Sequence, residues 1–373
     1  MPDAPDDAPR PPDALQVRSG VHAAPSINPA LQRRRRVLLT VDAYVAGVRA
    51  GDRGVLSQAI TLIESTQPAH QATAQAVLAA CLPHVGRSLR VGITGVPGVG
   101  KSTFIETLGI RLTAQGHRLA VLAIDPSSAR SKGSILGDKT RMERLAADPR
   151  AFIRPSATGG SLGGVARQTR ETITLCEAAG YDLIFVETVG VGQSEITVHS
   201  MVDVFVLLAL AGAGDELQGI KRGIVEMADL VAIHKADGSN RAPAKEALRA
   251  IRAALHLYPP ADSGWTPQTL LCSSLTGDGI DEVWAAIQAY QAHAAETGFF
   301  EARRQRQAWH WTQQTVEQTV LRAFYAHPAV QSVLPRLKEE VAGSQRSSFA
   351  AAEALWRAFN EPPGATGTTP ETP

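Results

Sequence analysis

Between residues 89 and 292, short apolar runs alternate with segments that have the spacing of amphipathic helices. The apolar runs span residues 89–94, 118–124, 151–154, 183–186, 204–209, 230–233 and 269–272. Strands that alternate with helices in this way build a mostly parallel, doubly wound sheet with helices on both faces. The pattern therefore predicts an α/β domain over 89–292, with a ligand site at the carboxyl ends of the strands.

Both flanks of this domain have a helical pattern. Apolar residues recur at helical spacing over 37–88, which predicts an N-terminal helical subdomain. Over 293–360 the sequence predicts an amphipathic helical arm. Its apolar positions at near-heptad spacing are Trp309, Val316, Val320 and Phe324, with Trp311 on a neighbouring face. Two interpretations of the arm stay open, a contact between two copies in a homodimer or packing onto its own sheet.

The two ends of the chain, 1–36 and 361–373, are rich in Pro with Ala and Asp or Thr and Gly, and they are predicted to be disordered tails. Arg33–Arg36 form a cluster of arginines that suits either an acidic partner or the solvated start of a helix, and the second interpretation is favoured.

Composition argues against a nucleic-acid-binding, membrane or disulfide-rich secreted protein. The chain has 373 residues, 44% of them hydrophobic and 20% charged, and a net charge of +1, so no overall field favours nucleic acid or a membrane surface. Cys81, Cys176 and Cys272 are scattered and form no disulfide framework. No apolar run has the length of a membrane span, and the N-terminus lacks a secretory signal, so a cytoplasmic location is expected.

The first apolar run leads directly into the phosphate-binding pattern G-x-x-x-x-G-K-[ST]. A strand before such a loop and a helix after it let backbone N–H groups surround phosphate oxygens at a helix N-terminus. Lys101 is expected to reach the β- and γ-phosphates, and Ser102 to offer its hydroxyl to Mg²⁺. The predicted phosphate-binding residues are Gly95, Val96, Pro97, Gly98, Val99, Gly100, Lys101, Ser102 and Thr103.

Acidic residues follow the predicted strands at the same edge. Glu187 directly follows the apolar run at 183–186 and is a candidate for holding Mg²⁺. Gly190 is placed to donate its N–H to the γ-phosphate. Asp125 and Asp138 are further metal candidates, and each also suits a structural role as a turn or helix-capping residue. Lys101, Asp138, Glu187 and Gly190 form the predicted catalytic set.

A second motif concerns the base. His234-Lys235-Ala236-Asp237 resembles the N-K-x-D motif with which GTPases recognise guanine, except that His stands in the place of Asn. A carboxylate at Asp237 can accept two hydrogen bonds from guanine, which adenine cannot donate, and Lys235 can cover the ring. Ser273, Ser274 and Leu275 follow the last predicted strand and are placed to contact the base through their backbone. The effect of His234 on base affinity stays open.

Taken together, these residues resemble one family of P-loop GTPases, the MeaB group of G-protein chaperones for adenosylcobalamin-dependent acyl-CoA mutases, also known as ArgK or LAO/AO transport kinases. The resemblance covers roughly residues 38–345. The matching stretches lie at 92–109, 123–128, 133–142, 152–164, 184–195, 211–229 and 234–238, of which GSILGDKTRM and VETVGVGQSE are the most specific.

The resemblance implies more than the spacing shows. It implies GTP/GDP and Mg²⁺ as ligands, slow GTP hydrolysis, and a homodimer formed through C-terminal helices. It also implies a switch that gates loading of adenosylcobalamin and protects or reactivates a mutase, typically methylmalonyl-CoA mutase, with cobalamin held by the partners. Gln193, Asp215, Gln218 and Lys221 are then the candidates that relay the nucleotide state to the mutase.

Three alternatives to this interpretation stay open. A nickel metallochaperone GTPase should carry a His- or Cys-rich cluster, and the ten histidines here are dispersed. A protein kinase acting on a periplasmic amino-acid transport protein would transfer phosphate to a protein. A nucleotide-gated binding module would hydrolyse GTP only incidentally. Which acyl-CoA mutase is served stays open.

Overall fold

The computed structural model describes residues 38–124, 142–155, 162–188, 194–211, 222–259 and 261–360. The compact unit discussed below begins at Val41. Among the helices in these ranges, none combines the length and the apolar character needed to cross a membrane.

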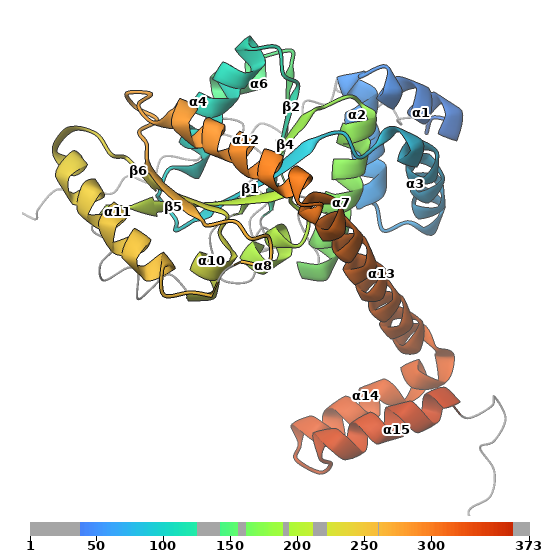
Figure 1. Ribbon diagram of the computed structural model, residues 1–373. Helices are drawn as coiled ribbons and strands as arrows, with labels where there is room; N and C mark the ends of the chain where they lie inside the picture. The colour runs from blue at the N-terminus through green and yellow to red at the C-terminus, as the bar shows by residue number, and fades with distance from the viewer. Residues whose placement is uncertain are drawn as a thin grey trace, which may run out of the picture. The chain divides into compact units, whose positions relative to one another are not determined.

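The centre of the unit is a seven-stranded sheet with the order β3-β2-β4-β1-β5-β6-β7 (Figure 1). Its strands are β1 Leu89–Gly95, β2 Leu119–Ile124, β3 Ala151–Arg154, β4 Leu183–Thr188, β5 Val204–Leu210, β6 Leu230–His234 and β7 Gln268–Leu271. Every neighbouring pair among them is parallel. The inner strands are buried on both faces, which explains their continuous apolar runs. The predicted fold class, an α/β P-loop fold with a mostly parallel sheet, is confirmed.

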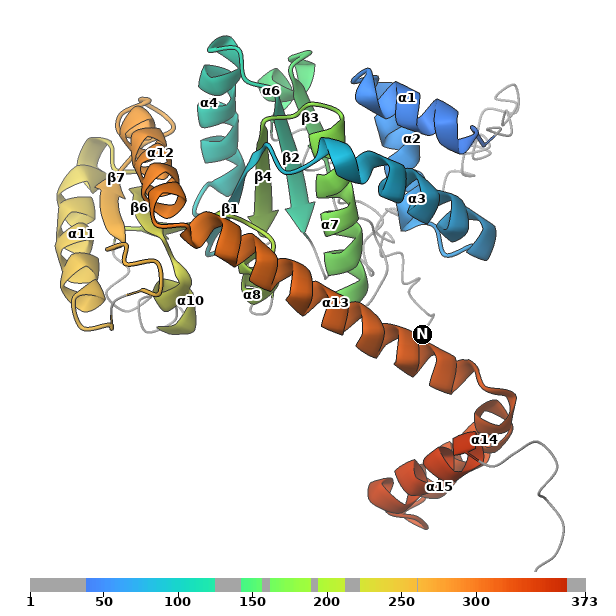
Figure 2. The ribbon, with the colours of Figure 1, turned by 45° about the vertical axis from the view of Figure 1, so that its right-hand side comes forward.

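Helices cover both faces of the sheet (Figure 2). On one face α4 (Lys101–Ala114), α6 (Glu143–Ala147) and α12 (Ile280–Glu296) share a core with Phe104, Leu145 and Ile287. On the other face α10 (Arg222–Met227) and α11 (Arg241–Leu255) pack on β5 and β6. Alternation along β5 separates the two cores, because Leu208 belongs to the first and Leu207 to the second.

Three helices precede the sheet, α1 (Val41–Arg49), α2 (Arg53–Glu64) and α3 (Pro68–Cys81), followed by a short 3₁₀ turn, Leu82–His84. They pack on one another and on α7 (Leu162–Ala178). The Asp52 carboxylate begins α2 by accepting hydrogen bonds from the N–H groups of Gly54 and Val55 at 2.7 and 3.0 Å. The helical content agrees with the periodicity of this region, and the subdomain boundary at residue 88 stays a prediction.

Two aspartates, the buried Asp203 and the half-buried Asp229, organise the amino edge of the sheet. Asp203 and Asp229 each stand one residue before a strand and accept a hydrogen bond from the backbone N–H of a residue in the neighbouring strand, Arg90 and Phe205 respectively. The adjacent residues Arg303 and Arg304 bind these carboxylates, Arg303 at 3.2 Å from Asp229 and Arg304 at 2.7 Å from Asp203. The beginning of the C-terminal arm is thereby fixed to the sheet.

The arm consists of α13 (Phe299–Ala326), α14 (Pro328–Ala342) and α15 (Ser348–Asn360), and α14 packs on α15 beyond the end of α13 (Figure 1). Trp311 is buried: its indole N–H donates to the Ser200 carbonyl at 3.0 Å, and the Arg170 guanidinium lies 3.9 Å from its ring. Phe324 packs against Trp356 and Phe359 of α15. The arm therefore packs within its own chain through Trp311 and Phe324.

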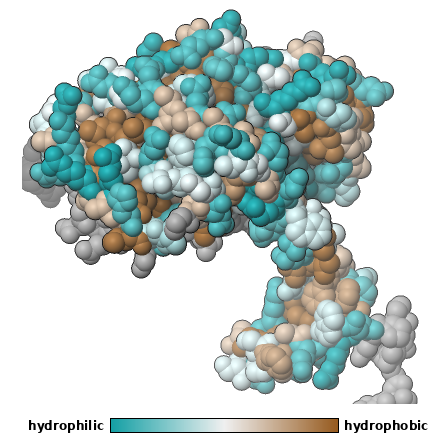
Figure 3. Space-filling view, in the orientation of Figure 1, coloured by the Kyte–Doolittle hydropathy of each residue, from teal (hydrophilic) through white to brown (hydrophobic). Residues whose placement is uncertain are grey.

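The other predicted positions of the arm remain on the surface. Trp309, Val316 and Val320 are 64%, 56% and 59% exposed, and Figure 3 shows apolar surface along this part of the arm. The structure thus divides the predicted apolar face into a packed part and an exposed part. The homodimer contact stays a prediction.

We expect the substitution Asp203→Ala to destabilise the protein by about 3–5 kcal/mol, because it leaves the partly buried Arg304 guanidinium without its carboxylate. Glu353→Ala, which removes an exposed ion pair with Arg357, is the matched control and should cost less than about 0.5 kcal/mol. Denaturant unfolding of both variants measures the difference. Equal losses of stability would show that Arg304 does not depend on its carboxylate.

Candidate nucleotide site

The phosphate-binding loop connects β1 to α4 at the carboxyl edge of the sheet. Gly98 and Gly100 have φ angles of +81° and +101°, which turn the chain so that α4 begins at Lys101. The N–H groups in the first turn of a helix have no partner within that helix and carry partial positive charge. The loop therefore presents donors where phosphate oxygens are expected.

Two glycines permit close approaches that a side chain would prevent. A Cβ atom at Gly95 would collide with the backbone oxygen of Leu208 on β5, and one at Gly100 would lie 2.7 Å from Cε1 of His234. The loop thus packs directly against the ends of the neighbouring strands β5 and β6. A loop shaped to bind phosphate requires glycine at both positions.

Lys101 lies across the loop that it follows. Its Nζ donates to the backbone oxygens of Gly95 and Val96 at 2.8 and 3.3 Å. Burial lowers the pKa of Lys101, and the negative charges of Glu187 and Glu195 oppose that shift. The ammonium group is therefore held inside the loop, where its charge faces the expected position of the phosphates.

The predicted metal residues Ser102 and Glu187 are neighbours in space. The Ser102 hydroxyl donates to the Glu187 carboxylate at 3.0 Å, and Glu187 is buried at the end of β4. Next to it, the Thr188 hydroxyl donates to the Thr94 hydroxyl at 2.9 Å and joins the ends of β4 and β1. A hydroxyl and a carboxylate oxygen this close are ligands that suit Mg²⁺.

His234 links the phosphate loop to the predicted base loop. Its Nδ1 lies 2.6 Å from the Val99 carbonyl oxygen and its Nε2 lies 2.7 Å from the Ser274 hydroxyl. A carbonyl only accepts, so Nδ1 carries the proton and Nε2 accepts from Ser274. Burial lowers the pKa of His234, which keeps this neutral form.

Asp237 and Lys235 lie beside this link. The Ser273 hydroxyl donates to the Asp237 carboxylate and also receives the Leu275 N–H at 3.2 Å. Lys235 has a φ of +57°, and its Nζ donates to the Gly98 carbonyl at 2.8 Å. Asn240, which the motif does not contain, donates from its side chain to the Lys235 carbonyl at 2.7 Å.

The structure therefore brings the phosphate loop, Glu187, the 234–237 motif and residues 273–275 to one edge of the sheet. It also adds Thr94, Thr188 and Asn240, to which the sequence analysis assigned no role. Predicted residues that lie outside the described ranges are Asp125, Asp138, Gly190, Gln193, Asp215, Gln218 and Lys221. Within the described ranges, no group of three or more His, Cys, Asp or Glu residues is arranged to hold a metal ion.

Comparison with known proteins gives consistent results. The family model described as "Methylmalonyl Co-A mutase-associated GTPase MeaB" matches residues 56–329. A protein of Mycobacterium tuberculosis named as a probable GTPase is 50% identical over 321 residues, which are 86% of this chain and 96% of that protein. The mouse protein "Methylmalonic aciduria type A homolog, mitochondrial" is 46% identical over 329 residues, 86% of this chain and 79% of its own.

A solved structure is also similar to this chain. The crystal structure described as a LAO/AO transport system kinase is 36% identical, has a TM-score of 0.68, and is matched over 87% of this chain and 100% of its own. The family model covers well over half of the chain, and the relatives are matched over most of their length. The chain therefore belongs to the MeaB family of P-loop GTPases.

Proposed function

We propose that this GTPase is a nucleotide-switched chaperone that gates adenosylcobalamin loading and protects or reactivates a B12-dependent acyl-CoA mutase, most directly methylmalonyl-CoA mutase. The observation that carries the proposal is the family itself, whose description names a mutase-associated GTPase. The guanine-type motif at the sheet edge, placed beside a complete phosphate loop, supports the switch.

Recognition of GTP and GDP is assigned to Asp237. Its carboxylate is oriented by the Ser273 hydroxyl, and the same hydroxyl fixes the backbone of the loop that follows. An oriented carboxylate selects guanine, because a base without the matching pair of donors would leave it unpaired. Lys235 is held on the phosphate loop by the Gly98 carbonyl, where its stem can cover the ring.

The phosphates and Mg²⁺ are assigned to the other half of the site. Lys101 and the first turn of α4 would bind the β- and γ-phosphates, and Ser102 and Glu187 would hold the metal, with Asp125 and Asp138 as further candidates. Mg²⁺ would supply neutralisation of the charge on the phosphate oxygens. Glu187 and Thr188 end β4 directly before Gly190 and Gln193, so the metal-binding end of this strand leads into the predicted switch.

A mutase partner and a homodimer complete the proposal. The mouse relative is named for methylmalonic aciduria, which supports methylmalonyl-CoA mutase as the partner. The exposed apolar positions Trp309, Val316 and Val320 support a homodimer formed through α13. Asp215, Gln218 and Lys221 are proposed to relay the nucleotide state, and cobalamin is proposed to be held by the partners.

One alternative to GTP hydrolysis is transfer of phosphate to a protein. It is supported by the similar crystal structure, which is described as a transport system kinase. Incubation with γ-labelled GTP or ATP separates the two. A GTPase releases labelled phosphate, whereas a kinase leaves label on a protein acceptor.

For the base site, we expect Asp237→Ala to weaken GDP binding roughly 100- to 10,000-fold, since two hydrogen bonds to a charged acceptor are lost. ADP binding should change little, so the preference for GDP disappears. Calorimetric titration with both nucleotides measures this, and Asp281→Ala, an exposed aspartate paired with Arg111, is the control. An unchanged preference for GDP in Asp237→Ala would refute the assignment.

For the histidine link, we expect stability to decrease with acidification. Because burial lowers the pKa of His234, the unfolded chain takes up its proton near pH 6.5 while the folded protein does not. The free energy of unfolding should therefore fall as pH drops below about 6.5, and less steeply in His234→Asn. Denaturation at pH 8 and pH 5 measures both slopes, which should coincide if His234 is not held neutral by the fold.

For the partner, we expect purified methylmalonyl-CoA mutase to accelerate GTP hydrolysis by the wild-type protein. Glu187→Gln should reduce hydrolysis roughly a hundredfold, because it weakens the metal site that stabilises the transition state. Phosphate release with and without mutase is the measurement, with GDP affinity as the test of folding. Equal rates with and without methylmalonyl-CoA mutase would exclude stimulation by this partner.

A further inference from the structure

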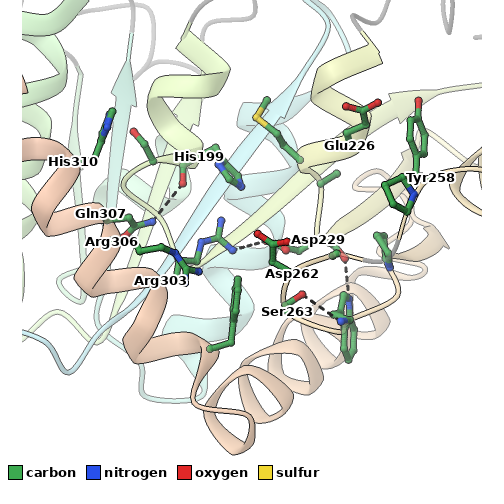
Figure 4. A pocket seen from close by; sticks show the side chains of 18 residues that line it. His199, Glu226, Asp229, Tyr258, Asp262, Ser263, Arg303, Arg306, Gln307 and His310 are labelled. Carbon is green, nitrogen blue, oxygen red and sulfur yellow. Dashed lines mark hydrogen bonds and ion pairs between the residues drawn. The ribbon is translucent and has the colours of Figure 1, made fainter.

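A second cavity lies at the opposite edge of the sheet from the nucleotide site. Its volume is about 560 Å³, and it is lined by the ends of α8 (Ser194–His199) and α10, by residues within 258–259 and 261–267, and by the beginning of α13 (Figure 4). Asp229 in its wall precedes β6, whereas His234 in the nucleotide site ends it. A volume of this size accommodates a small organic molecule.

One helix face supplies a polar wall. Arg303, Arg306, Gln307 and His310 line the cavity from α13 at the spacing i, i+3, i+4 and i+7, which places them on one side of that helix. A helix that packs on a protein core normally directs apolar residues along this stripe. Here the stripe is cationic and polar, and a cavity lies where packing would be expected.

The inner part of this wall has unsatisfied hydrogen-bonding groups. Arg303 is 92% buried, its relative exposure being 8%, and its Nη1 donates to Asp229 and to the Tyr290 hydroxyl at 3.2 and 3.0 Å. Its Nη2 has no hydrogen-bond partner among the described residues, and neither has Oε1 of Gln307. Such groups normally find a partner in the folded state, and a charged donor without one attracts an acceptor.

Burial, and after it the positive charge of Arg303, lowers the pKa of His199 to about 4. His199 is therefore neutral at physiological pH and adds no charge of its own.

Another part of the lining is aromatic and apolar. The Trp265 indole N–H donates to the Asp229 carbonyl at 3.1 Å, and its ring packs edge-to-face on Tyr290 at 5.4 Å. Tyr258 and Met227 extend this wall. The acidic residues Glu226 and Asp262 also line the cavity and are exposed, and Asp229 is paired with Arg303, so Arg306 is the guanidinium that the lining leaves available to an anion.

We propose that this cavity binds a small organic anion with a flat apolar body, the body lying against Trp265 and Tyr258 and the anionic group beside Arg306 and Arg303. The site is separate from the GTPase site and does not depend on the proposed mutase partner.

A charge series of one ring system tests the proposal. GDP-saturated protein is titrated by calorimetry with 1-naphthoate, 1-naphthamide and 1-naphthylmethylammonium, so that the nucleotide site is already filled. We expect the anion to bind about tenfold more tightly than the amide, and the cation to bind most weakly. Equal affinities for the three probes, or no binding at millimolar concentration, would overturn the proposal.

A pair of arginine variants locates the binding. Arg306→Gln should weaken binding of 1-naphthoate about fivefold, whereas Arg322→Gln, an exposed arginine of the same helix outside the cavity, should leave it unchanged. GDP affinity, measured in parallel, should be the same in both variants and reports folding. An equal effect of the two substitutions would place the anion elsewhere and refute the site.

Discussion

All strands of the sheet run in one direction, and this constraint gives the protein two chemically different edges. At the carboxyl edge, β1, β4 and β6 end in Gly95, in Glu187 and Thr188, and in His234. At the amino edge, backbone N–H groups of the strands donate hydrogen bonds to the carboxylates of Asp203 and Asp229. Nucleotide chemistry gathers at one edge because the strands end there, and the arm is anchored at the other.

His234 connects the phosphate loop to the predicted base loop. These two loops are far apart in sequence, and in the proposed site they must keep a fixed separation to hold one nucleotide. An imidazole has nitrogens on opposite sides of a rigid ring, so His234 reaches Val99 and Ser274 at the same time. The ring in turn occupies the space where a Cβ of residue 100 would lie, which makes glycine necessary there. A change at either position therefore affects the other.

The sequence predicted what depends on local pattern. The seven apolar runs became the seven strands, and the phosphate loop lies between β1 and α4 as its motif requires. Contacts between residues distant in the chain were not predictable. The partners of Arg303 and Arg304 lie 74 and 101 residues away, and arginines on an amphipathic helix ordinarily face water. Likewise, near-heptad spacing could not reveal that Phe324 packs on α15 while Val316 stays exposed.

The two edges are joined by a short strand. β6 begins directly after Asp229, in the wall of the second cavity, and ends at His234 in the nucleotide site. Five residues of extended chain span about 16 Å. This strand is hydrogen-bonded on both sides, to β5 and β7. α8 and α10 provide a second connection, because they line the cavity and begin directly after Gln193 and Lys221, which are predicted to belong to the switch and relay segments.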